Sequence, residues 1–325
     1  MSDVLISVIV PLYNSVPYIK KCVEHLCKQT IGNKLELVFV DDGSSDDSVD
    51  KVKYYLNEFH FRGSFKFIVH HENKGAAVAR IDGIMAATGE YVIFCDSDDW
   101  MESDMCEKML ELAYKNGSDL VICDYVNDYS DKPSNKSSKC YISPYLHHLL
   151  LCRVTGSLCN KLVKRDIFFT PGFVFPQHSF CEDYVYSIQY AILCDTISYL
   201  PEAMYHYCHR KGSIVMADNE ESINRRIYEN LENYNNVILI LKQSGLFSEF
   251  QNEIIALKLI IKNSILLYLP RKGYYAKWKK TFPELTFEIL RSKEVSFRSK
   301  IKYFLTLSGV FPLYIYANNF LRCRK

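Results

Sequence analysis

Four short apolar runs rich in branched residues alternate with stretches of helical periodicity in the first hundred residues. The runs cover residues 4–10, 35–40, 65–70 and 90–95, and the helical patterns between them cover 16–29, 48–59 and 75–87. Strands and helices alternating at this spacing form parallel βαβ units, in which helices cover both faces of the sheet. The sequence therefore predicts an α/β protein with a doubly wound sheet.

Further elements follow the first hundred residues. A helix is expected over 103–115, a strand over 119–126 and a polar loop over 127–145, and from residue 220 onward the pattern is helical. The 325 residues are 48% apolar and 24% charged, which suffices for a large core and excludes disordered, collagen-like and coiled-coil proteins. We expect an α/β body followed by a C-terminal helical region.

Neither a membrane span nor an export signal is expected. The chain contains no run of about 18 uncharged apolar residues, and its first residues lack a basic segment and a small-residue cleavage site. Its twelve cysteines are scattered without a Cys-x-x-Cys pair, which favours buried reduced thiols over disulfides or a zinc ribbon. A cytoplasmic location follows.

Four short segments follow the predicted strands, at the edge where α/β sheets bind their ligands, and three of them are polar. These segments are 11–14, 41–46, 71–75 and 96–99. Asp96 and Asp98 can converge on one hard cation such as Mg²⁺ or Mn²⁺, although a lone Asp-x-Asp more often caps the next helix. No Gly-x-Gly-x-x-Gly and no P-loop motif is present, which argues against dinucleotide and P-loop phosphate sites.

Two further strand-end features have both a structural and a functional interpretation. Asp42 can face a ligand while Ser44, Ser45 or Asp46 caps the helix that begins near Ser48. Arg80 lies early in a helix of small residues, where it can hold a diphosphate or stack on a base, or form a surface ion pair. Their position beside two acidic strand ends favours the ligand site.

Together these segments resemble inverting glycosyltransferase family 2, which has the GT-A nucleotide-diphospho-sugar transferase fold. The matching stretches are 7–14, 40–46, 73–75 with 79–80, and 94–99, in register over residues 5–100. The resemblance implies a Rossmann-like mixed sheet with helices on both faces. It also implies a nucleotide-sugar site formed by Pro11, Tyr13, Asn14, Asp42, Lys74, Arg80, Asp96, Ser97, Arg210 and Ser213.

Specific roles follow from the resemblance. Asp42 would hydrogen-bond the base, and Arg80 would lie near the base or the diphosphate. Asp96 would contact the ribose side. Asp98, with Asp96 as a second candidate, would coordinate the Mn²⁺ or Mg²⁺ that bridges the two phosphates.

The later motifs resemble the family more loosely. Residues 156–165 are similar to its "NKLYKR" segment, and 180–184 resemble its "ED" motif, which implies Asp183 as catalytic base supported by Glu182. Without the resemblance, this pair is interpreted as two acidic residues that stabilise the N-terminus of a helix. Residues 205–214 resemble the segment that closes over the diphosphate, with cysteine replacing the usual arginine at 208. His206 is a candidate metal ligand, although a packing or acceptor-loop role is favoured.

The resemblance implies a metal-dependent inverting glycosyltransferase of the hexosyltransferase type. It would move a sugar from a nucleoside-diphosphate sugar, most commonly a UDP-sugar, to a saccharide or lipid-linked saccharide in cell-surface polysaccharide synthesis. Residues 1–218 would form the catalytic domain, with nucleotide-sugar (1–125) and acceptor (126–218) halves, and 219–325 a basic helical region. The alternatives are a non-catalytic homologue and a sugar-nucleotide pyrophosphorylase, although the N-terminus lacks the Gly-rich basic loop of the latter.

The net charge of +1 is the sum of an acidic N-terminal segment and a basic C-terminal segment. Residues 1–130 hold 12 basic and 22 acidic residues, whereas 271–325 hold 13 basic and 3 acidic residues interleaved with aromatics. No nucleic-acid-binding motif accompanies the basic tail, so a nucleic-acid partner is not expected. Two interpretations stay open: a surface for the anionic inner face of the cell membrane, where the enzyme would be peripheral, or helices packed on the catalytic body.

Overall fold

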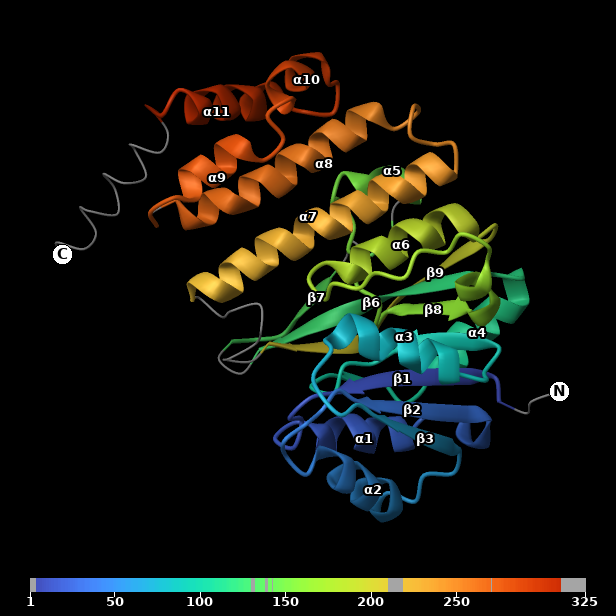
Figure 1. The fold of residues 1–325 in the computed structure, drawn as a ribbon. Coiled ribbons are helices and arrows are strands. Elements are labelled where there is room, and N and C mark those ends of the chain that lie inside the picture. The colour runs from blue at the N-terminus through green and yellow to red at the C-terminus, as the bar shows by residue number, and fades with distance from the viewer. Residues whose placement is uncertain are drawn as a thin grey trace. The chain divides into compact units, whose positions relative to one another are not determined.

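A mixed β-sheet organises the larger part of the protein (Figure 1). The computed structural model describes residues 4–129, 132–137, 140–141, 143–209, 219–269 and 271–310. Within these residues the strands are β1 (Ile6–Leu12), β2 (Leu35–Asp41), β3 (Ser64–Val69), β4 (Tyr91–Phe94), β5 (Trp100–Met101), β6 (Leu120–Tyr129), β7 (Asn135–Ser137), β8 (Lys161–Lys164) and β9 (Ile197–His209). They follow the order β3-β2-β1-β4-β8-β6-β9-β5, and β7 pairs with β6.

The first four strands form the predicted parallel layer. β1 pairs in parallel with both β2 and β4, so that Ile9 lies opposite Val38 and Phe94. Every residue of β2 is buried, as expected for a strand with helices on both sides. The apolar runs of β1, β2 and β4 therefore correspond to central strands, whereas β3 lies at the edge of the sheet with Phe65 and Val69 exposed. The predicted α/β class is confirmed.

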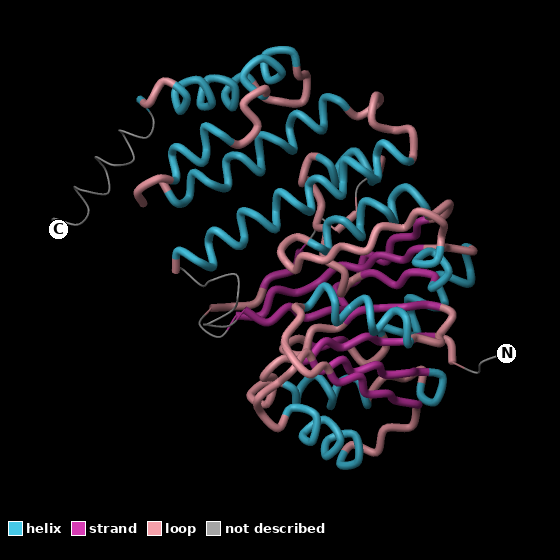
Figure 2. Tube along the Cα trace, viewed as in Figure 1, coloured by secondary structure: helices cyan, strands magenta, loops and turns pink. Residues whose placement is uncertain are grey.

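Helices cover both faces of this layer, as the cyan and magenta segments of Figure 2 show. The first-unit helices are α1 (Ile19–Cys27), α2 (Ser48–Glu58), α3 (Ala76–Ala86), α4 (Met105–Asn116), α5 (Tyr145–Leu150), α6 (Glu182–Leu193) and α7 (Glu220–Gln243). Strand order runs outward from β1 to β3 and returns to β4, so right-handed crossovers place α1 and α2 on one face and α3 on the other. Gly83 lets α3 approach β1, since a Cβ there would lie 2.4 Å from Ile9 Cγ2.

The remaining strands correct the expectation of a loop over 127–145. β6 continues to Tyr129, and Asn127 pairs with both Tyr207 of β9 and Asn135 of β7. α5 begins within the same stretch, at Tyr145. The polar sequence of 127–129 gave no sign of a strand. The strand forms there because it pairs with β9, which lies about eighty residues further along the chain.

The chain divides into two compact units. One comprises Met1–Leu149 with Val154–Ile240, and the other Leu150–Arg153 with Leu241–Lys325. Most of α7 thus belongs to the first unit, where Asn233 Nδ2 donates to the carbonyls of His178 and Phe180 at 3.0 and 2.8 Å. The division falls after Ile240, whereas the sequence placed the end of the catalytic domain at residue 218, before this helix.

The second unit is helical, as predicted for the C-terminal region. It holds α8 (Gln251–Ser264), α9 (Tyr274–Lys280), α10 (Leu285–Arg291) and α11 (Phe297–Leu307). Trp278 and Tyr303 are buried at its centre, and the ammonium of Lys262 lies 4.6 Å from the Trp278 ring. Among the helices described, none is both long and apolar enough to cross a membrane.

Candidate active site

The turns after β1 and β2 are tied together at the carboxyl edge of the sheet. Asn14 has a left-handed backbone with φ of 48°, and its Oδ1 accepts hydrogen bonds from the amide and hydroxyl of Ser45 at 2.9 and 3.2 Å. Pro11 lies within β1 opposite Val40, and Tyr13 is 49% exposed. Asn14 therefore fixes the shape of this edge, while Tyr13 offers its ring to solvent.

Asp42 anchors the loop that precedes α3. Its buried carboxylate accepts hydrogen bonds from the amides of Lys74 and Gly75 at 2.9 and 2.7 Å, and it lies 2.8 Å from Nδ1 of His70. Oδ1 of the neighbouring Asp41 is also buried, with no hydrogen-bond partner among the described residues. This part of the edge therefore combines a loop fixed by hydrogen bonds with two buried carboxylates.

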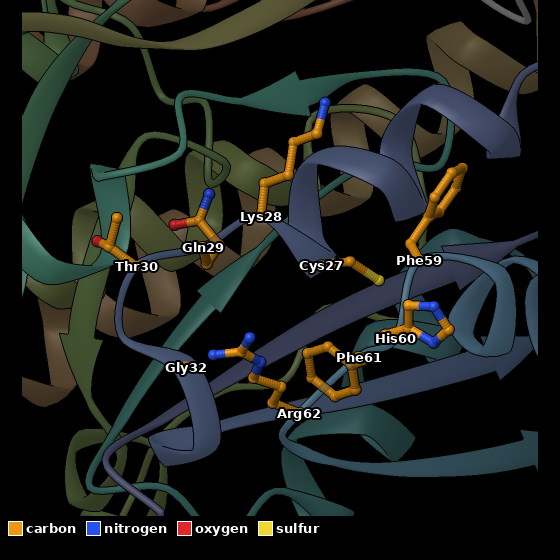
Figure 3. Close-up of a pocket in the computed structure, with 9 residues that line it drawn as sticks. All are labelled: Cys27, Lys28, Gln29, Thr30, Gly32, Phe59, His60, Phe61 and Arg62. Carbon is orange, nitrogen blue, oxygen red and sulfur yellow. The ribbon is translucent and has the colours of Figure 1, made fainter.

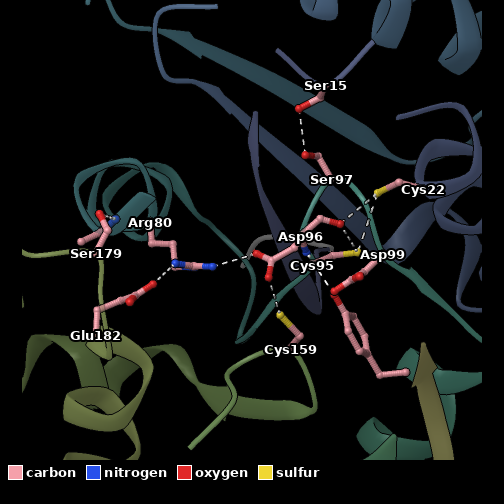
Figure 4. Close-up of polar contacts among 12 residues, drawn as sticks. Ser15, Cys22, Arg80, Cys95, Asp96, Ser97, Asp99, Cys159, Ser179 and Glu182 are labelled. Atoms are coloured by element: carbon pink, nitrogen blue, oxygen red, sulfur yellow. Dashed lines mark hydrogen bonds and ion pairs between the residues drawn. The ribbon is translucent and has the colours of Figure 1, made fainter. Parts of the chain in front are cut away.

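Arg80 joins the acidic motif after β4 to the start of α6 (Figure 4). Its guanidinium donates to Asp96 Oδ1 at 2.7 Å and to Glu182 Oε1, a set that we call the Arg80 bridge. Burial opposes the charge of Arg80, but the carboxylates of Asp96 and Glu182 outweigh it and raise the pKa of the guanidinium. Residues more than a hundred positions apart therefore meet at one point.

The remaining residues of the acidic motif have distinct surroundings. Ser97 Oγ lies 2.8 Å from Ser15 Oγ, and Asp98 is half-buried. Asp99 is buried, and it accepts hydrogen bonds from the hydroxyl of Tyr205 at 2.6 Å and the amide of Cys208 at 2.8 Å. Burial, together with Asp96 and Asp98, raises the pKa of Asp99. Asp99 thus ties this motif to β9, a role that the sequence prediction missed although the residue adjoins Asp98.

Glu182 and Asp183 form the first turn of α6. Burial raises the pKa of Glu182 to about 8, with Arg80 acting in the opposite direction. Burial also raises the pKa of Asp183, while the charges of Arg80 and Lys161 oppose the rise. Asp183 Oδ1 accepts from the amide of Tyr184 at 2.8 Å. A carboxylate with a raised pKa beside the acidic motif is suited to accept a proton.

Lys161, which lies in the "NKLYKR"-like segment, is buried near this pair. Its ammonium donates to the carbonyl of Ser157 and to Asn160 Oδ1, the latter at 3.2 Å. Burial lowers the pKa of Lys161 to about 8. The lysine therefore holds the loop before β8, whose Cys159 Sγ lies 3.6 Å from Asp96 Oδ2.

The remaining predicted site residues are His206, Lys74, Arg210 and Ser213. Both ring nitrogens of His206 lie against carboxylates, Nδ1 at 2.9 Å from Asp128 and Nε2 at 3.0 Å from Glu102, and the ring stacks on Trp100. This arrangement supports the packing interpretation over metal ligation. The side chain of Lys74 is exposed. Arg210 and Ser213 lie outside the described residues.

A cavity of about 430 Å³ lies elsewhere in the first unit (Figure 3). Its lining residues are Cys27, Lys28, Gln29, Thr30, Gly32, Phe59, His60, Phe61 and Arg62. These segments precede β2 and β3, so the cavity adjoins the amino ends of the strands. None of the predicted site residues lines it, and the carboxyl edge remains the candidate site.

Comparison with known proteins gives consistent results. The model of the family described as "Glycosyl transferase family 2" matches residues 7–179. The chain is 30% identical over 303 residues to the putative glycosyltransferase EpsH of Bacillus subtilis, covering 90% of this chain and 83% of that protein.

Solved structures share the fold. S. aureus TarS 1–349 in complex with UDP-GlcNAc superposes with a TM-score of 0.58 at 21% identity, covering 88% of this chain and 90% of that one. The mannosyltransferase PcManGT of Pyrobaculum calidifontis, in complex with GDP-Man and Mn²⁺, gives a TM-score of 0.50 at 17% identity, covering 88% and 86%. Both likenesses confirm the predicted nucleotide-sugar transferase fold.

Proposed function

The chain belongs to glycosyl transferase family 2 and is a glycosyltransferase, and from this premise we propose that it transfers a sugar from a nucleoside-diphosphate sugar to a hydroxyl group with inversion at the anomeric carbon. The Arg80 bridge is the observation that carries the proposal, because it joins Asp96 of the acidic motif to Glu182 of the acidic pair. A direct displacement needs the base beside the donor, since both reactants must be held together.

Asp183 is the proposed base, supported by Glu182, which holds Arg80. As the acceptor oxygen bonds to the anomeric carbon, Asp183 takes its proton, a contribution typically of ~10²–10⁴ in rate. The bond from that carbon to the diphosphate breaks at the opposite face, and the nucleoside diphosphate leaves with the electron pair. The burial that raises the pKa of Asp183 favours this role, because it makes the carboxylate a stronger base.

The donor site would lie along the carboxyl edge. Pro11, Tyr13, Asn14, Asp42, Lys74 and Ser97 would hold the nucleoside, and Arg80, Arg210 and Ser213 would face the diphosphate. An oxygen-only donor set fits a hard cation, so Asp98, with Asp96, would hold Mn²⁺ or Mg²⁺. When bound, such an ion neutralises charge on the leaving diphosphate. The UDP-GlcNAc complex of TarS and the Mn²⁺ complex of PcManGT support a UDP-sugar and manganese.

The proposed acceptor is a saccharide or a lipid-linked saccharide in cell-surface polysaccharide synthesis. Residues 126–218 would form its half of the site and 1–125 the nucleotide-sugar half. The enzyme would act in the cytoplasm, with the basic region 219–325 toward the inner face of the membrane. The excess of 13 basic over 3 acidic residues in its last segment, 271–325, supports this orientation.

A panel of nucleotide sugars with Mn²⁺ tests the proposal. A bound donor should raise the unfolding temperature, and turnover should release the nucleoside diphosphate. In Asp183→Asn, donor stabilisation should persist while turnover falls about a hundredfold or more. Asp166→Asn, at a side chain 82% exposed, is the matched control.

Three results would contradict the proposal. Unchanged turnover in Asp183→Asn would reject the base. No release from any donor would favour a non-catalytic homologue. Synthesis of a nucleotide sugar from a sugar phosphate and a nucleoside triphosphate would favour a pyrophosphorylase.

A further inference from the structure

The neighbouring helices α10 and α11 carry exposed apolar side chains together with basic ones. The apolar side chains are 43% to 78% exposed. Phe297, Ile301 and Leu305 recur every four residues along α11, so they share one face of that helix. We define the α10–α11 face as Phe287, Leu290, Phe297, Ile301 and Leu305 with the exposed basic residues Arg291, Arg298 and Lys302.

These exposed apolar side chains do not belong to the core of the second unit. Each helix buries other residues on its inner side, namely Leu285 and Ile289 of α10 and Tyr303 of α11. The Thr286 and Tyr303 hydroxyls lie 2.9 Å apart and join the two helices. Since the helices are already packed through their inner faces, folding does not account for Phe287 and Phe297, each 78% exposed.

The surrounding charge is positive and is not balanced within the segment. Residues 271–310 contain 10 basic and 3 acidic residues. All three acids pair with basic residues outside the segment: Glu284 and Glu288 with Lys258, each at 2.9 Å, and Glu294 with Arg153 at 3.0 Å. The acids therefore leave the positive charge of the segment largely intact.

We propose that the α10–α11 face docks on an anionic lipid bilayer, its apolar side chains entering the interface and its basic side chains meeting lipid phosphates. Apolar burial and attraction to anionic lipid act together in such surfaces. A second copy fits less well because two positive faces repel each other. Nucleic acid also fits less well, since apolar side chains dominate the face. The inference rests on the proposed membrane-side function and deepens it by naming the docking surface.

Vesicle co-sedimentation of the full-length protein tests the face. Vesicles of phosphatidylcholine mixed with phosphatidylglycerol should bind the protein, and vesicles of phosphatidylcholine alone should bind it much less. The triple variant Phe287→Ser, Phe297→Ser, Ile301→Ser should bind the anionic vesicles about tenfold more weakly. Tyr54→Ser on α2, at a side chain 60% exposed, is the control and should bind like the unchanged protein. Unfolding temperatures should change little, since all four side chains are exposed.

Equal binding by the triple variant and the unchanged protein would overturn the proposal, as would a lack of binding to anionic vesicles. Equal binding to both vesicle types would also overturn it, because the basic residues would then play no part. If the unchanged protein is a dimer that the triple variant dissociates, the face belongs to a second copy. Nucleoside-diphosphate release with soluble and detergent-dissolved lipid-linked saccharide acceptors, measured without vesicles, is the separate readout. Its absence with vesicle binding intact refutes the proposed transferase function and leaves the docking surface standing.

Discussion

Replacing Arg80 by methionine removes the cation from the middle of the Arg80 bridge. The side chains of Arg80 and Glu182 are each 9% exposed, and that of Asp96 is 30% exposed. Breaking a buried pair by removing one partner costs about 3–5 kcal/mol. At neutral pH, Glu182 is mostly protonated because its pKa is about 8, and water reaches Asp96. We therefore expect the cost to lie below that range, with the free energy of unfolding falling by about 2 kcal/mol at neutral pH.

The loss should depend on pH. Burial raises the pKa of Glu182 to about 8 while Arg80 acts against the rise, so removing Arg80 should raise this pKa further. An acid with a raised pKa in the folded state contributes stability that is full below its unfolded pKa and is lost as pH rises through its folded pKa. Above about pH 8 the unchanged protein no longer loses this stability, whereas Arg80→Met still does because its Glu182 titrates at higher pH. The difference in free energy of unfolding between the two proteins should therefore widen by up to about 1.4 kcal/mol per pH unit.

Urea unfolding from about pH 6 to about pH 9 measures both effects. The set comprises Arg80→Met, Glu182→Gln and their double variant, with Arg62→Met at an exposed position as control. In the Glu182→Gln background the widening with pH should disappear. A cost below about 1 kcal/mol at every pH, or a widening that persists without Glu182, would refute the bridge as described.

Three further predictions concern the same site. Lys161→Met removes a charge that lowers the pKa of Asp183, so the acidic limb of the kcat/KM profile should move to higher pH; an unmoved limb would count against Asp183 as the base. Gly43→Ala places a Cβ 2.6 Å from the backbone of Glu72 at a φ of +71°, so the unfolding free energy should fall by roughly 1–3 kcal/mol in denaturant titrations. Asp98→Asn should abolish the Mn²⁺-dependent rise in unfolding temperature seen with a nucleoside diphosphate, whereas persistence of that rise would place the metal elsewhere.

Local pattern determined the fold class and the place of the site. Strands buried on both faces are mostly apolar, so β1, β2 and β4 were visible as runs even though β2 includes the buried Glu36. Parallel strands carry their carboxyl ends at one edge of the sheet, so the sequence predicts that Asp42 and Asp96 lie at the same edge. The sequence also predicted the C-terminal helices, because their periodicity is local.

Only the tertiary structure decided which of these side chains meet. Arg80 pairs with Glu182 across 102 positions, and Asp99 reaches Tyr205 across 106. The extension of β6 and the two carboxylates around His206 likewise depend on segments far apart in the sequence. Periodicity reports the environment of a residue relative to its neighbours in the chain. The partners of a residue on other strands and helices are fixed only when all the elements have packed together. The roles of Arg80 and Asp99 could therefore be seen only in the folded chain.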